Sequence, residues 1–299
     1  GIPLRRIDST GFMIGDTGTN YHRKTEAWRG MMLLTVARGG WVNTVHGNLE
    51  FLGEDDARWF AKVQKLYAPL QRHGLMTSFG KTPGDVEPYG FAAEGADGGL
   101  YAVVNPAQRE VSLRLPGIGA GGRVLFRDAG FVPVLEGDAV RLGPGQMALI
   151  GTGRYDDARY DLGVQSDIRI PRAIAPLPAS FRRDDPGGVI ETTIAAPPAD
   201  LRIILQQRDP EGFLTRSSGG TAPNAANMRD VLVIESDQGG KKLPVQSRYD
   251  KVLWSGLSWA VGEIRAADMT PGEPLRVRLS STDNDPPVML DGRLYRVEY

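Results

Sequence analysis

The first quarter of the 299-residue sequence concentrates the side chains that could do acid–base chemistry, including all three histidines. The segment 16–23 brings together a carboxylate, an amide, a phenol, an imidazole and a guanidinium, which are Asp16, Asn20, Tyr21, His22 and Arg23. This mixture of donors and acceptors suits a hydroxyl-rich ligand. Arg23 can also pair bidentately with a carboxylate. Asp16 is therefore a candidate catalytic residue and the other four are candidate substrate contacts. The alternative is a polar loop in which Asp16 and Asn20 form turns.

A second polar stretch covers residues 41–50. If its first half is a strand, Trp41 and Asn43 share one face. Asn43 is a candidate substrate ligand, and Asn48 in the following turn is another. Trp41 could stack on the ligand, although burial in a core is the stronger alternative.

The same stretch supplies two further candidate catalytic residues, His46 and Glu50. Both side chains can exchange a proton near neutral pH in a suitable environment. A structural histidine with satisfied hydrogen bonds is an equally good interpretation of His46. No acid–base pair can be assigned from these residues alone.

Metal and cofactor signals are weak throughout the sequence. There is no cysteine, so a thiolate site is excluded and the redox compartment cannot be inferred. His22 and His46 lack helical spacing and a recognisable third ligand. The run Asp283-Asn284-Asp285 resembles part of a calcium loop but lacks the glycine and late glutamate of that motif. No phosphate-binding or nucleophile-elbow motif is present. We expect neither a metal nor a cofactor.

Charge and hydropathy exclude two classes of partner. The 35 basic and 36 acidic residues give a formal net charge of −1, so no cationic field for nucleic acid is expected. The longest apolar run, at residues 31–37, is too short to cross a membrane.

A removed signal peptide is compatible with a start at Gly1, which indicates a processed, tagged or partial chain. A periplasmic or secreted location is favoured, with a cytoplasmic one as the alternative, and a homo-oligomer is possible.

The elements that must position the polar residues are two strand–helix units. Residues 11–15 and 41–45 read as strands. A helix begins near Thr25 and ends at Gly39-Gly40. The second helix begins at three acids, 54–56, carries apolar side chains at helical spacing, and ends at Gly74.

Two such units do not make a stable domain, because short parallel strands need further strands beside them. The segment 1–76 is therefore expected to be the end of a larger assembly, plausibly the last two units of a (β/α)8 barrel. In such a barrel the carboxyl ends of the strands face the substrate, which is where 16–23 and 43–50 would lie. The missing strands would come from an absent N-terminal barrel segment or from a partner chain. The alternative is a small α+β cap on a β-sandwich.

The rest of the chain is predicted to be β structure, since 38 glycines and 21 prolines separate short runs of partial period-2 alternation. Residues 77–155 are expected to form an antiparallel β-sandwich. Residues 156–299 are expected to contain a linker and a second antiparallel β-sandwich. In that domain Trp254 and Trp259 could form a sugar-stacking platform, although burial is the stronger alternative.

Three stretches resemble the C-terminal end of barrel glycoside hydrolases, particularly the melibiase (alpha-galactosidase) clan. They are 24–37 (KTEAWRGMMLLTVA), 47–59 (GNLEFLGEDDARW), and 100–106 (LYAVVNP) with 111–115 (VSLRL). The resemblance implies a final pair of barrel units followed directly by a β-sandwich. The catalytic carboxylates of that clan lie on earlier strands, which this sequence lacks. The resemblance therefore implies a catalytic pair outside this chain and leaves the stereochemistry open.

These observations lead to two hypotheses. The first is the C-terminal portion of an exo-acting glycoside hydrolase on a glycan substrate. Galactose is one possible terminal sugar. Sialic acid, as in barrel sialidases, is the other, because Arg23 and Arg29 border the expected site. The second is a non-catalytic carbohydrate-binding or assembly module in which the β-rich region binds, through Trp254 or Trp259.

Overall fold

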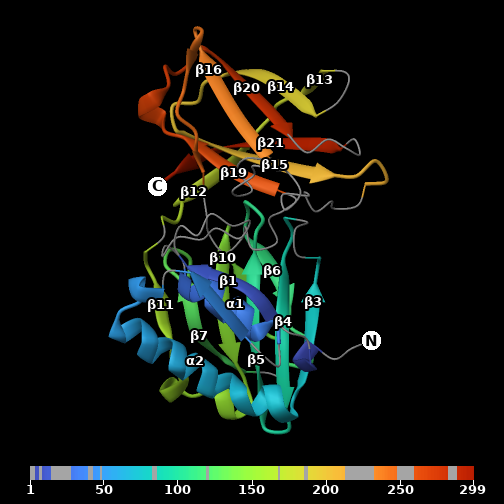
Figure 1. The fold of residues 1–299 in the computed structure, drawn as a ribbon, viewed down its shortest axis with the longest axis vertical. Coiled ribbons are helices and arrows are strands. Elements are labelled where there is room, and N and C mark those ends of the chain that lie inside the picture. Colours follow the sequence, from blue (N-terminus) through green and yellow to red (C-terminus); the bar gives the residue numbers. More distant parts are fainter. Residues whose placement is uncertain are drawn as a thin grey trace. The chain divides into compact units, whose positions relative to one another are not determined.

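The computed structural model describes residues 4–6, 9–14, 28–39, 43–47, 49–82, 86–118, 121–167, 169–184, 188–212, 232–247, 259–281 and 288–299. The described residues up to Ile170 belong to one compact unit and those from Pro171 onward to a second. Figure 1 shows the helices in the first unit and mainly β structure in the second.

The first unit begins with the two predicted strand–helix pairs. They are β1 (Ser9–Ile14), α1 (Trp28–Ala37), β2 (Asn43–Gly47) and α2 (Glu54–His73). Short 3-10 turns, η1 (Leu4–Arg6) and η2 (Leu49–Phe51), precede β1 and α2. The two strands pair in parallel, as strands joined by a helix do.

Helix α2 forms where the spacing and end signals predicted it. Glu54, Asp55 and Asp56 occupy its first turn, where carboxylates are favoured by the helix dipole. The Asp56 side chain accepts a hydrogen bond from the Gly53 backbone N–H, at 3.3 Å. At the other end the Gly74 N–H donates to the Leu70 carbonyl, at 2.7 Å. One face is buried, comprising Trp59, Val63, Leu66, Tyr67 and Leu70.

Two sheets complete the first unit. Their strands are β3 (Leu75–Gly80), β4 (Tyr89–Gly95), β5 (Gly98–Asn105), β6 (Val111–Arg114), β7 (Arg123–Asp128), β8 (Val134–Glu136), β9 (Ala139–Leu142), β10 (Gln146–Gly151) and β11 (Gly163–Gln165). The six-stranded sheet has the order β11-β7-β10-β5-β4-β3, and the three-stranded sheet β6-β9-β8. The expected sandwich is therefore present between these two sheets, and its core is the cluster Ala92, Tyr101, Val103, Ala107, Val111, Leu113, Leu115, Val140, Leu142, Ala148 and Ile150.

The central strands of the six-stranded sheet are buried on both faces. Every residue of β10 is buried, as are all residues of β5 except Gly98. One face meets the three-stranded sheet, while α1 contacts β4 and β5 and α2 contacts β3 and β4. Figure 1 shows both helices over the same face of the sheet. Continuous apolar runs such as 100–104 and 147–150 are typical of strands covered on both sides. The described residues show this three-layer arrangement and no closed barrel.

The segment 153–170 belongs to the first unit and is more than a linker. It contains η3 (Gly153–Tyr155), η4 (Ala158–Tyr160) and β11, which pairs in parallel with β7. The expectation of a purely antiparallel sandwich is wrong at this edge. A strand of three residues is too short to show a periodic pattern in the sequence. Its position in the sheet depends instead on side-chain contacts.

Those contacts come from residues far apart in the sequence. The Gln165 side chain accepts a hydrogen bond from the Gly30 N–H in α1, at 2.9 Å, and donates to the Asp128 carboxylate, at 2.8 Å. Asp128 is fully buried and also accepts from the Met147 N–H, at 2.8 Å. The amide of Gly30 lies in the first turn of α1, where N–H groups lack helical partners. Gln165 therefore links helix α1 to the buried sheet.

Tyr67 carries a buried phenol that has no hydrogen-bond partner among the described residues. Burial raises the pKa of Tyr67 above its usual range, and the nearby Tyr155 adds to the rise. Above the unfolded pKa of about 10, the unfolded chain releases a proton that the folded chain keeps. The Tyr67 phenol thus makes the folded state less stable as the pH rises beyond that value.

Tyr67→Phe is expected to leave stability near pH 8 unchanged or to raise it by up to about 1 kcal/mol, because the substitution removes an unsatisfied buried hydroxyl. It is also expected to weaken the alkaline loss of stability. Urea unfolding of both proteins between about pH 8 and about pH 11 measures the two effects. The same pH slope in both proteins would contradict the assignment to Tyr67.

The second unit is a sandwich of two five-stranded sheets. Its strands are β12 (Ala173–Leu177), β13 (Arg182–Asp184), β14 (Val189–Ala195), β15 (Asp200–Arg208), β16 (Leu232–Gln238), β17 (Lys241–Lys242), β18 (Gln246–Ser247), β19 (Trp259–Ile264), β20 (Pro274–Ser281) and β21 (Met289–Glu298), with η7 (Ala266–Asp268) before β20. The sheet orders are β12-β21-β15-β19-β18 and β13-β14-β20-β16-β17.

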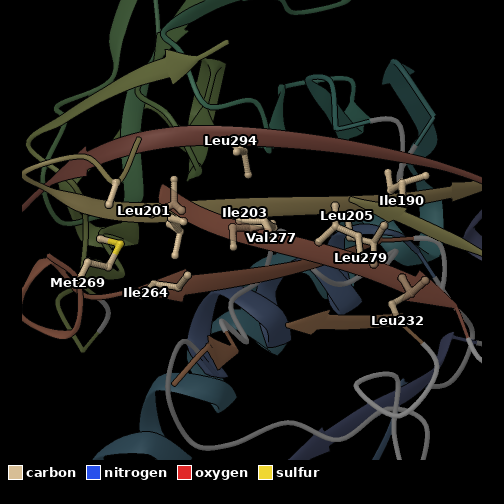
Figure 2. Packing of buried hydrophobic residues seen from close by; sticks show 12 residues of the cluster. Ile190, Leu201, Ile203, Leu205, Leu232, Ile264, Met269, Val277, Leu279 and Leu294 are labelled. Carbon is tan, nitrogen blue, oxygen red and sulfur yellow. The ribbon is translucent and has the colours of Figure 1, made fainter. Parts of the chain in front are cut away.

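Aliphatic side chains from both sheets form the core of this unit, as Figure 2 shows. Leu201, Ile203 and Leu205 alternate along β15, and Leu275, Val277 and Leu279 alternate along β20. This is the period of two that places every second side chain on the inner face. The β structure expected for residues 156–299 is thus observed, with the runs 189–194, 201–207, 275–279 and 294–297 lying in β14, β15, β20 and β21. A similar run at 251–254 lies outside the described residues.

Candidate functional site

The parallel register of β1 and β2 brings the carboxyl ends of these two strands together. Ser9 pairs with Asn43, Met13 with His46, and Ile14 with Gly47. Ile14 and Gly47 are the last residues of their strands, so the carboxyl ends of β1 and β2 are adjacent. Residues 16–23 lie outside the described residues, and their position beside residues 43–50 stays a prediction.

Most of the predicted site residues lie outside the residues that the structure describes. Those outside the described residues are Asp16, Asn20, Tyr21, His22, Arg23, Trp41 and Asn48. Asn43 and His46 are placed in the backbone of β2, at its first and fourth positions. Their roles, and those of the residues outside, stay predictions.

Glu50 lies in the short turn η2, and its side chain is exposed. It follows the carboxyl end of β2 by three residues, so it belongs to the same edge. An exposed carboxylate is well suited to contacting an incoming ligand.

Arg29 is tied to other side chains. Its guanidinium donates to the Asp56 carboxylate at 2.9 Å and lies 5.9 Å from the ring centroid of Trp28 and 5.5 Å from that of Trp59. Ion pairing and stacking on aromatic faces are both typical of arginine. Arg29 therefore joins α1 to the start of α2, and its charge already has a carboxylate partner.

Among the described residues, no group of three or more histidine, aspartate or glutamate side chains could hold a metal ion. No helix in the described part of the chain is long and apolar enough to span a membrane.

The two tryptophans of the predicted sugar-stacking platform are not both described. Trp259 is the first residue of strand β19, which the sequence did not predict, and Trp254 lies outside the described residues.

The surface cavities among the described residues include two that the sequence did not predict. One, of about 260 Å³, borders the edge strand β3 and includes Phe79, Lys81 and Tyr89. The other, of about 470 Å³, lies in the second unit between residues 178–182 and strand β14. No motif marks either cavity, because the first depends on how the ends of β3 and β4 pair and the second on where the chain passes between two sheets.

Comparison with known proteins gives a limited likeness. No known protein family and no curated relative matches the sequence. Similar solved structures include the trehalose-6-phosphate hydrolase of Bacillus licheniformis, at 18% identity and a TM-score of 0.26, and the isomaltulose synthase of Erwinia rhapontici NX5, at 14% identity and a TM-score of 0.26. Another is an isomaltulose synthase from Klebsiella sp. LX3, at 18% identity and a TM-score of 0.24.

Each of these matches covers 38% of this chain and 22% of the other. The chain therefore spans about a fifth of the length of the solved structures it resembles. By their names these neighbours are carbohydrate-active enzymes, and they lend no support to the melibiase clan or to sialidases in particular. At such TM-scores the likeness concerns part of a fold and carries no conclusion about activity.

Proposed function

We propose that this chain is the C-terminal portion of an exo-acting glycoside hydrolase, in which β1, α1, β2 and α2 complete a (β/α)8 barrel. The observation that carries the proposal is the parallel pairing of β1 and β2. A parallel sheet of two strands is rare by itself, because parallel strands normally lie inside larger sheets covered by helices. Further parallel strands, from a preceding segment or a partner chain, would complete such a sheet.

The adjacent carboxyl ends of β1 and β2 give the proposal its site. In (β/α)8 enzymes the loops after the strands hold the substrate. Asn43, His46 and Glu50 lie on β2 or just after it, and the predicted contacts 20–23 follow β1 in the sequence. The role we assign to them is contact with the terminal sugar, with the catalytic acid and base supplied by the completing strands.

Two terminal sugars fit the proposal, galactose and sialic acid. With Arg29 committed to Asp56, Arg23 is the arginine left to pair with a sialic acid carboxylate. A neutral hexose needs no such partner. A comparison of aryl galactosides with aryl sialosides as substrates separates the two.

The test is an assay of a longer form that contains the polypeptide encoded directly before Gly1, on a panel of aryl α- and β-glycosides. Hydrolysis of at least one substrate is expected. His46→Ala is expected to lower kcat/KM by about tenfold or more, the effect of losing one hydrogen bond to the reacting substrate.

His73→Ala is the matched control, since His73 is exposed at the end of α2 and far along the chain from the proposed site. Its kcat/KM should equal that of the unmodified protein. No hydrolysis of any substrate would overturn the hydrolase proposal. Saturable sugar binding without hydrolysis would instead favour a non-catalytic carbohydrate-binding module.

A further inference from the structure

The larger cavity arises where the chain crosses from one sheet of the second unit to the other. Strand β12 ends at Leu177, and the chain enters β13 at Arg182, which pairs with Glu191 of β14. Strand β13 covers β14 only at Val189–Glu191. Among the described residues, no strand covers the remaining edge of β14, so the cavity lies between that open edge and the crossing segment.

The lining of this cavity has a polar part and an apolar part. The polar part consists of Ser180, Arg182, Glu191, Thr192 and Thr193, and the apolar part of Pro178, Ala179 and Ile194. The volume of about 470 Å³ lies within the range of small-molecule sites. The open edge of β14 adds backbone N–H and C=O groups, which need partners from water or a ligand.

Charges in the cavity are close to balanced. Glu191 accepts two hydrogen bonds from Arg276, at 2.6 and 3.2 Å, and Arg276 also lies 4.0 Å from the Asp237 carboxylate. No ion pair within the described residues involves Arg182, whose side chain is exposed. The cavity therefore offers one uncommitted guanidinium beside a carboxylate that is held in place by another arginine.

We propose that this cavity binds a neutral sugar. Arg182 donates hydrogen bonds to ring or hydroxyl oxygens, Glu191 accepts from a pair of hydroxyls, and Thr193 both donates and accepts. The C–H face of the sugar packs against the exposed ring of Pro178. Balanced charge favours an uncharged polyol over an anion, and a volume of about 470 Å³ accommodates one or two sugar rings.

This site is independent of the proposed hydrolase activity, because its residues all belong to the second unit. Its occupancy would hold a glycan on the protein whether or not the chain hydrolyses it. Trp254 and Trp259, the two predicted sugar-stacking residues, do not line this cavity.

The test is binding to the full 299-residue chain, with methyl galactoside, methyl glucoside and methyl mannoside as probes and glucuronate as the charged comparison. Saturation-transfer NMR and isothermal titration calorimetry measure the affinity. We expect saturable binding of at least one neutral probe, and a loss of about tenfold or more in Arg182→Ala, the size expected for hydrogen bonds from a charged group.

Arg183→Ala is the matched control, since Arg183 is the next residue of β13, is also exposed, and does not line the cavity. Its affinity should equal that of the unmodified chain. Thr193→Trp, which fills the cavity from an exposed position, should abolish binding with an unchanged circular dichroism spectrum.

Three results would overturn the proposal. They are the absence of saturable binding for every neutral probe, equal affinity in Arg182→Ala and Arg183→Ala, and tighter binding of glucuronate than of the neutral sugars. None of the three bears on hydrolysis by the longer form, so the two proposals fail separately.

Discussion

Glu263→Ala is expected to destabilise the second unit by about 3–5 kcal/mol, because it leaves the buried guanidinium of Arg202 without its carboxylate. The two residues are opposite each other on β15 and β19. Arg202 contacts the Glu263 carboxylate through Nε at 2.7 Å and Nη2 at 2.6 Å, and the two side chains are 8% and 4% exposed. The Tyr299 hydroxyl lies 2.6 and 2.7 Å from the two carboxylate oxygens, and Arg202 donates to that hydroxyl at 3.1 Å.

Urea unfolding followed by far-UV circular dichroism measures this effect. Asp291→Ala is the matched control, because it breaks the exposed Arg293–Asp291 pair on strand β21 of the same sheet. Exposed pairs contribute about 0–1 kcal/mol. The double variant Arg202→Met with Glu263→Leu should recover most of the lost stability, since it removes both buried charges together. An equal decrease in the free energy of unfolding in Glu263→Ala and Asp291→Ala would show that the buried pair contributes no more to stability than the exposed one.

Trp59→Ala is expected to destabilise the first unit by about 3–5 kcal/mol, as large-to-small changes in a core do. The Trp59 indole is 8% exposed and meets Trp28 edge-on, with ring centroids 5.4 Å apart, and Phe126 at 5.7 Å. Its Nε1–H donates to the Leu162 carbonyl at 2.9 Å. Removing the ring leaves a cavity where α1, α2 and β7 meet and deprives a buried carbonyl of its donor.

Two further variants separate these contributions in the same unfolding experiment. Trp59→Phe keeps an aromatic ring but loses the hydrogen bond, so it should cost clearly less than Trp59→Ala. Phe51→Ala removes a large side chain that is 55% exposed, and its effect should be within about 0.5 kcal/mol. A loss in Trp59→Ala as small as that in Phe51→Ala would contradict the proposed packing.

Local signals in the sequence determined much of this fold. Helix α2 could be predicted because its acids, its apolar spacing and Gly74 all agree. The strands at 100–104 and 147–150 could be predicted because their apolar runs are bounded by turns. Strand β11 could not be predicted, because three residues carry no periodic pattern and its position depends on Gln165, 135 residues from its partner Gly30.

Polar residues after two expected strands predicted a shared edge, and the parallel register of Ile14 with Gly47 makes the carboxyl ends of β1 and β2 adjacent. The positions of the polar side chains themselves stay a prediction. Arg29 shows why the partners of a side chain could not be predicted. An arginine near polar residues has the same sequence context whether it binds a ligand or, as here, the carboxylate of Asp56. The cavity at Arg182 was missed altogether, because the crossing between two sheets that makes it has no sequence signature.

The six-stranded sheet covered on both faces also bears on how this region evolves by recombination. Helices α1 and α2 lie against one face of the sheet and the three-stranded sheet against the other. A gene fusion with its junction between α2 and β3 would replace both helices. The apolar strands that they cover would then be exposed to solvent. Exchange of the preceding region by recombination would therefore preserve this fold only if α1 and α2 are inherited together with the sheet.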